Sequence, residues 1–220
     1  MKLKKTLIVA SALVAGALTS NAATYSLFNV AGGPGTDTLW ANLDGSLMNG
    51  SGFVTMGYFA TNPLTTDIDT IAELVALKST FTAVQTATPG LSVAFTAAGF
   101  LAEDPAVVSS ITGSNALIGR KLYAIASNAS SLAAATALNA FSLFEVATIV
   151  DDVPFEQNYV ANPAGSTVII GELGAYEDAG DAFGLGEGTY TTLKLVGVPE
   201  PSAALLGAFG VLGLLRRRRI

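Results

Sequence analysis

The stretch Gly52-Phe53-Val54-Thr55-Met56-Gly57-Tyr58-Phe59-Ala60 decides the fold class that we expect for this chain. It is rich in aromatic and β-branched residues, which suit the pleated surface of a sheet, so we predict a strand there. Similar short runs recur along the chain, separated by turn signals about every 8–15 residues. They lie at Thr24–Val30, Phe81–Thr88, Leu91–Phe100, Val107–Ile111, Gly119–Ala126, Phe141–Val146, Thr167–Gly171 (expected to be buried) and Thr189–Val196.

This spacing of short runs favours a mainly β fold over a series of βαβ units. We expect a single β-sandwich-like domain with one short helix over residues 23–197, and an α+β fold is the alternative. A body of this length can bury one core without disulfide bonds, which the sequence could not supply because it contains no cysteine.

The expected helix lies at Asp67–Lys78, the one segment with a clear helical stripe. Thr66 is predicted as its N-cap, with Asp67 and Asp69 in the first turn, where acidic side chains favour the positive end of the helix dipole. We expect the helix to end near Lys78–Phe81. The apolar stripe consists of Ile68, Ile71, Leu74, Val75 and Leu77.

The N-terminus has the features of a secretory signal peptide, which we place at residues 1–22. Lys2, Lys4 and Lys5 form a basic segment, and an apolar segment, Leu7–Leu18, follows it. Ser20-Asn21-Ala22 then puts small residues at both specificity positions of a cleavage site, so we predict cleavage between Ala22 and Ala23. The expected signal helix would be absent from the exported protein.

The C-terminal segment 198–220 has three parts in a fixed order. Pro199-Glu200-Pro201 is followed by Ser202–Leu215, which is 14 residues without a charge, and then by Arg216–Arg219. As a helix the apolar part would span roughly 21 Å, which is shorter than a bilayer core of roughly 30 Å. We therefore expect a transient membrane segment, with the arginines held on the cytoplasmic side.

This tail resembles the PEP-CTERM sorting signal of Gram-negative bacteria. The resemblance rests on Pro199, Glu200, Pro201, the apolar helix ending in Gly213–Leu215, and the basic residues Arg216, Arg217, Arg218 and Arg219. It implies recognition by an exosortase, a membrane-embedded cysteine transpeptidase, after transient anchoring in the inner membrane. It also implies export to the cell surface or the extracellular polysaccharide matrix. An ordinary single-span C-terminal anchor is the alternative interpretation.

The charge of the body excludes one class of partner. Residues 23–197 contain four basic and sixteen acidic residues, a net charge of −12 against −6 for the whole chain. So acidic a body will not bind nucleic acid through phosphate contacts, whereas cation binding or repulsion-driven solubility would suit it. The sequence also has no histidine, the usual general base and commonest metal ligand, so we expect no catalytic residues, no metal site and no cofactor.

Four features of the body could still bind a ligand or carry chemistry. Trp40, the single tryptophan, could be a sugar platform, although a core or rim position fits it better. Arg120 and Lys121 could hold an acidic sugar or a phosphate, but a solvated strand start is the simpler interpretation. Asp151, Asp152 and Glu156 could supply the carboxylate pair of a glycoside hydrolase, without any visible partner residue or cleft.

The fourth feature is the segment Glu172–Glu187, which holds several carboxylates among glycines and could bind Ca²⁺. Its spacing does not set six or so ligands around one ion, so we expect a solvated acidic loop. Taken together, these patterns favour a non-enzymatic structural protein of the exopolysaccharide matrix, secreted or held at the cell surface. Exosortase, the membrane and exopolysaccharide are its expected partners. The alternative is a secreted carbohydrate-binding module, with or without Ca²⁺ assistance.

Overall fold

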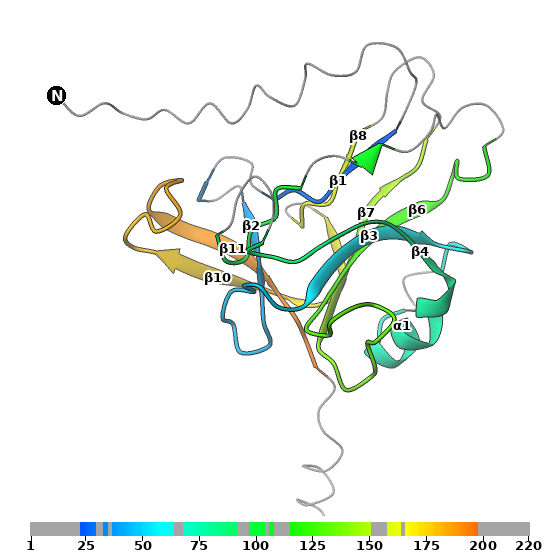
Figure 1. Cartoon of the computed structure of the whole chain (residues 1–220), viewed down its shortest axis with the longest axis horizontal. Coiled ribbons are helices and arrows are strands. Elements are labelled where there is room, and N and C mark those ends of the chain that lie inside the picture. The colour runs from blue at the N-terminus through cyan, green and yellow to red at the C-terminus, as the bar shows by residue number, and fades with distance from the viewer. Residues whose placement is uncertain are drawn as a thin grey trace, which may run out of the picture.

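The computed structural model describes residues 23–29, 33–34, 37–63, 68–91, 97–103, 106–107, 115–150, 158–163 and 166–197. Within these ranges the protein is mainly β, with several sheets and one short helix (Figure 1). The prediction of a mainly β body with one short helix is therefore confirmed. The predicted signal peptide, the predicted sorting tail and the Asp151, Asp152 and Glu156 cluster lie outside the described residues. Within the described residues, no helix has the length and apolar character needed to cross a membrane.

The largest sheet is antiparallel and has the strand order β4-β3-β6-β7-β9. All five of its strands were predicted, with bounds close to those expected. The strands are β3 (Phe53–Phe59), β4 (Phe81–Ala87), β6 (Lys121–Ser127), β7 (Phe141–Thr148) and β9 (Thr167–Ile170).

Two three-stranded sheets complete the described fold. Each contains one parallel pair that joins an early strand to a late one, β1 with β8 and β2 with β11. The first sheet, in the order β5-β1-β8, consists of β1 (Thr24–Ser26), β5 (Ala106–Val107) and β8 (Asn158–Val160). The second, in the order β10-β11-β2, consists of β2 (Thr38–Ala41), β10 (Glu172–Asp178) and β11 (Gly188–Lys194).

The centre of the five-stranded sheet is buried on both faces, which explains why β3 and β6 consist of nearly continuous apolar runs. On one face Phe53 and Tyr123 pack in a cluster with Leu74 of the helix. On the other face Met56 and Ala124 belong to a cluster that includes residues of both smaller sheets. The central strands β3 and β6 therefore have few exposed residues.

The helix α1 (Ile71–Leu77) begins later than the sequence suggested. Its N-cap is Thr70 and not Thr66, because Glu73 stands three residues after Thr70 and completes a capping box. The Thr70 hydroxyl accepts a bond from the Glu73 N–H, and the Glu73 carboxylate accepts from the Thr70 N–H. The predicted end is confirmed, since a short 3₁₀ turn, η2 (Lys78–Thr80), leads directly into β4.

Two further predictions about strands were wrong. β9, expected to be buried, is an edge strand in which Ile170 alone is fully buried, because only β7 pairs with it in the described fold. The acidic segment expected to be a loop begins with a regular seven-residue strand, β10. Pairing with β11 along its whole length supplies the hydrogen bonds that outweigh its poor strand composition.

Candidate functional site

An open cleft of about 350 Å³ lies between the segment that follows β3 and the exposed side of α1. None of its lining residues was proposed from the sequence as a functional residue. The residues lining it are Thr61, Asn62, Pro63, Glu73, Ala76 and Leu77. We take this cleft and the polar network behind it as the candidate site.

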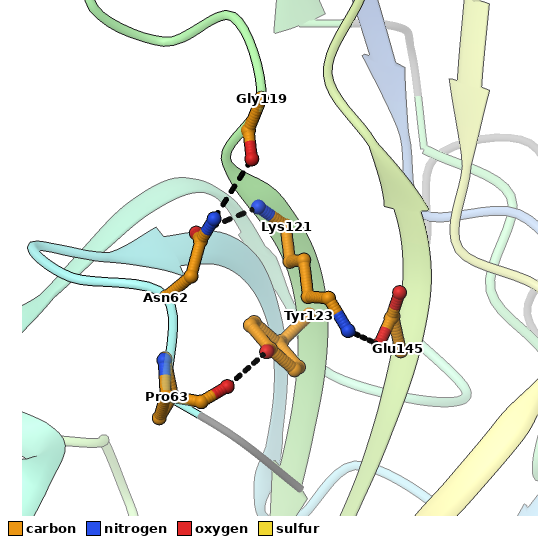
Figure 2. A network of polar contacts seen from close by, with 6 residues as sticks. All are labelled: Asn62, Pro63, Gly119, Lys121, Tyr123 and Glu145. Carbon is orange, nitrogen blue, oxygen red and sulfur yellow. Dashed lines mark hydrogen bonds and ion pairs between the residues drawn. The ribbon is translucent and has the colours of Figure 1, made fainter.

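Asn62 fixes one wall of the cleft to the start of β6 (Figure 2). Its side-chain amide donates to the Gly119 carbonyl at 2.7 Å and its side-chain oxygen accepts from the Lys121 N–H at 3.0 Å. The amide therefore satisfies one backbone acceptor and one backbone donor, as a neighbouring strand would do. This wall is positioned by hydrogen bonds rather than by a regular element.

Tyr123 lies behind the same wall and is fully buried. Its hydroxyl donates to the Pro63 carbonyl at 3.3 Å (Figure 2). Burial, with a smaller effect from the charge of Glu145, raises the pKa of Tyr123 to about 12. Near neutral pH this side chain is therefore a neutral hydrogen-bond donor and cannot serve as a base.

The two adjacent basic residues are occupied inside the fold. Lys121 donates to the Glu145 carboxylate at 2.7 Å, across the β6–β7 pair (Figure 2). The Arg120 guanidinium donates to the carbonyl oxygens of Phe59 and Ala60, at the end of β3. The strand start was predicted correctly, because β6 begins at Lys121 and both basic side chains are partly exposed. The anion-site interpretation gains no support, because oxygen atoms of the protein itself bind each cation.

The one carboxylate lining the cleft belongs to the helix cap. Glu73 accepts from the Thr70 hydroxyl at 2.6 Å, and this bond, together with one from Asp69, lowers the pKa of Glu73. The same contact with Glu73 raises the pKa of Asp69. The described lining thus offers one carboxylate, which is already committed to capping, and no second titratable side chain that could activate the Thr61 hydroxyl or form an acid–base pair.

Trp40 lies in the core. It has no exposed surface, and its ring centre is 5.7 Å from that of Phe144 on the facing sheet. A sugar ring could not reach it, so the sugar-platform alternative was wrong and the core interpretation is confirmed.

The carboxylates after β10 are turned toward their own backbone. Asp178 is buried and accepts from the N–H groups of Ala182 at 3.0 Å and Phe183 at 3.4 Å. Asp181, whose φ of 49° is left-handed, accepts from the Gly186 N–H at 2.7 Å. The described residues contain no group of three or more side chains that could hold a metal ion.

Comparison with known proteins gives no relative. No family model, no curated protein and no solved structure matches this chain.

Sequence reasoning missed two asparagines that organise the described fold. Asn62 precedes a proline, a turn signal that could have drawn attention to it. Asn29 is fully buried, and its side chain bonds to three backbone groups. In the sequence, only its alternation with Tyr25 and Leu27 indicated that this side chain points into the core. Both residues position backbone, and neither contributes a reactive group.

Proposed function

We propose that this chain is an exported protein of the cell surface or the extracellular matrix of a Gram-negative bacterium. Its C-terminal segment 198–220 is the sorting signal, read by an exosortase after transient anchoring in the inner membrane. The exported body has a non-enzymatic, structural role in the exopolysaccharide matrix. The observation that carries this proposal is the order of Pro199-Glu200-Pro201, a charge-free apolar segment and four arginines at the end of the chain.

The tail can halt passage through the membrane because of its charges. Each arginine costs about 2.5–3.5 kcal/mol to place at the centre of the hydrocarbon, so four in succession oppose transit strongly. Fourteen apolar residues alone make a weak stop. The chain therefore pauses with Pro199-Glu200-Pro201 near the outer face, where a processing enzyme can act on it.

The layout of the body supports a tail that is separate from the domain. The last strand, β11, ends at Lys194, and Val196 still bridges to Phe141 of the five-stranded sheet. The last described contact of the sheet thus lies shortly before Pro199. All described strands thus precede segment 198–220 in the sequence.

We also propose the finer description of this body as a β-sandwich-like domain. Met56, Ala124 and Phe144 of the five-stranded sheet share one buried cluster with Trp40 and Leu193 of the β10-β11-β2 sheet. A core filled by side chains from the facing sides of two sheets is the arrangement that defines a sandwich.

The competing proposal, a carbohydrate-binding module, is weakened because the residue that suggested it is not accessible to a sugar. Trp40 is inside the core, and the carboxylates of Asp178 and Asp181 bond to backbone N–H groups of their own loop. We therefore prefer the structural role. The absence of histidine and cysteine from the sequence, which removes the commonest catalytic bases and nucleophiles, supports its non-enzymatic part.

The sorting proposal is tested with two variants of the full chain, expressed in a bacterium that possesses an exosortase. Replacing Arg216–Arg219 by alanine removes the stop, so we expect longer, unprocessed protein in the periplasm or the medium. Glu200→Gln changes the motif and leaves the stop in place, so we expect unprocessed protein in the membrane fraction. Fractionation followed by intact mass measurement separates these outcomes.

Glu187→Gln is the matched control, because it makes the same chemical change on an exposed loop of the body. It should be processed and exported like the unaltered chain. If both tail variants fractionate identically and lose their tails normally, segment 198–220 is not a sorting signal.

A further inference from the structure

We propose that the outer edge of β10 pairs with β10 of a second copy of this chain, in an antiparallel arrangement centred on Gly174. The two β10-β11-β2 sheets then become one continuous sheet. This inference rests on the geometry of the described strands and does not depend on how the chain is sorted.

β10 is a regular seven-residue edge strand of the described fold. It pairs with β11 over seven residues without a register shift, and no described strand pairs with its other side. At the left of Figure 1 the hairpin of β10 and β11 extends away from the other sheets. A regular strand with unpaired N–H and C=O groups along one side is a template for another strand.

The other edges are shorter, irregular or in contact with another segment, and β4, which is as long as β10, has a register shift in its pairing with β3. β9 has four residues and a register shift in its pairing with β7. On the outer side of β4, the Gln85 side chain accepts from the Leu27 N–H at 2.7 Å. The outer side of β2 is used by bonds from the Trp40 N–H to the Gly99 carbonyl and from the Met48 N–H to the Trp40 carbonyl.

The charged residues of β10 do not protect its edge. Glu172 forms an ion pair of 2.6 Å with Lys194 on β11, and Glu177 accepts from the Thr189 hydroxyl at 2.5 Å, also on β11. Asp178 is turned into its own loop. These carboxylates, which would normally repel a second strand, are thus bound to groups on β11 or in the loop after β10 and not directed at the open edge.

The middle of the strand, Leu173–Tyr176, is uncharged and largely exposed. Leu173 and Ala175 lie on the same face of the strand, and the Leu173 side chain is 59% exposed. An exposed leucine on an open edge is an apolar surface that pairing with another strand would cover.

Charge selects the register of a symmetric pair. Centring the pair on Ala175 would set Glu172 opposite Asp178 of the second copy, twice. Centring it on Gly174 sets Leu173 opposite Ala175 and Glu172 opposite Tyr176, and no two carboxylates face each other. Like charges directly opposite destabilise a strand pair, whereas apolar pairs stabilise it, so the Gly174 register is the favoured one.

The same features favour a second copy over an extended basic peptide. The Leu173 and Ala175 pair is self-complementary under two-fold symmetry, as a pair of identical strands requires. The acidic side chains that a basic peptide would need are already bound by Lys194 and Thr189. The two occupants also differ in salt dependence. Salt screens the repulsion between two acidic bodies and strengthens self-pairing, whereas it would weaken the binding of a basic peptide.

The absence of cysteine from the chain allows a direct test of the register. Two full-length chains with tags of different mass, one Leu173→Cys and one Ala175→Cys, are mixed in detergent and oxidised gently with glutathione disulfide. Opposite residues lie close enough for a disulfide and diagonal ones do not, so we expect the mixed dimer to exceed either self-dimer about ten-fold. Self-dimers as abundant as the mixed dimer would overturn the proposed register.

Leu138→Cys measures cross-linking by random collision or through the tail, because this side chain is 86% exposed and lies far from β10 in sequence. Cross-linking of this control at the level of the mixed pair would overturn the proposal.

In the cysteine-free chain, raising NaCl from about 0.05 M to about 0.5 M should increase the dimer fraction in sedimentation velocity. Leu173→Lys should reduce it several-fold, and a dimer fraction that neither change affects would also overturn the proposal.

Discussion

Replacing Asn29 by alanine tests whether this buried amide holds the first strand region to the rest of the core. The Asn29 amide nitrogen donates to the Thr38 carbonyl at 2.8 Å and to the Gly99 carbonyl at 3.0 Å. Its side-chain oxygen accepts from the Leu101 N–H at 2.7 Å. One side chain thus connects three separate stretches of backbone.

The loss in free energy of unfolding depends on which hydrogen bonds each of these backbone groups keeps after the substitution. The Gly99 carbonyl keeps its bond from the Trp40 N–H, whereas the Leu101 N–H has no other described acceptor. An unsatisfied buried group costs about 1–3 kcal/mol, so the loss of three bonds with one fully orphaned donor destabilises the protein by about 3 kcal/mol. At about 2–4 °C per kcal/mol for a domain of this size, the melting temperature falls by about 6–12 °C.

Thermal unfolding of the full chain, followed by circular dichroism, measures this shift. Asn158→Ala is the matched control, because Asn158 is exposed and accepts a single bond from the Thr24 hydroxyl at 3.0 Å. It should lower the melting temperature by about 2 °C or less. If Asn29→Ala melts together with this control, the amide does not stabilise the fold as reasoned.

Two further predictions concern the buried tyrosine and the N-terminus. The pKa of Tyr123, raised from 10.0 to about 12, makes a contribution to stability that is complete below pH 10 and lost between pH 10 and 12. In urea titrations over this range, Tyr123→Phe should therefore lose less stability with rising pH than the unaltered protein, and equal losses in the two proteins would contradict this assignment. Exported protein should begin at Ala23, and N-terminal sequencing that instead finds Met1 on surface-exposed material would exclude cleavage after Ala22.

The central strands of the five-stranded sheet could be predicted because their composition and their burial agree. Gly52–Ala60 and Gly119–Ala126 are rich in residues that suit a sheet, and the corresponding strands β3 and β6 are buried on both faces. β10 could not be predicted in the same way, because its residues are mostly exposed and its strand conformation depends on β11. Tertiary pairing decided the structure there, and local composition did not.

The errors at the helix and at the candidate site have a different physical cause. Thr66 and Thr70 are both acceptable N-caps, and the choice between them depends on the reciprocal bonds with Glu73. The cleft itself could not be foreseen, since Asn62 reaches across to Gly119 and Lys121, more than fifty residues away in sequence. Arg120 and Lys121 were visible as a basic pair, but nothing local showed that internal oxygen atoms would bind them.

The two parallel strand pairs determine when this protein can finish folding. Thr24 pairs with Asn158, and Thr38 pairs with Thr191. Neither small sheet can therefore form until a strand from the C-terminal part of the domain is available. Contacts of such long sequence separation form slowly, because the loops between them must close first. A chain exported N-terminus first, as proposed here, therefore emerges with its earliest strands unpaired. Its fold can close only after β11 has crossed the membrane, just ahead of the segment that we propose stops transit.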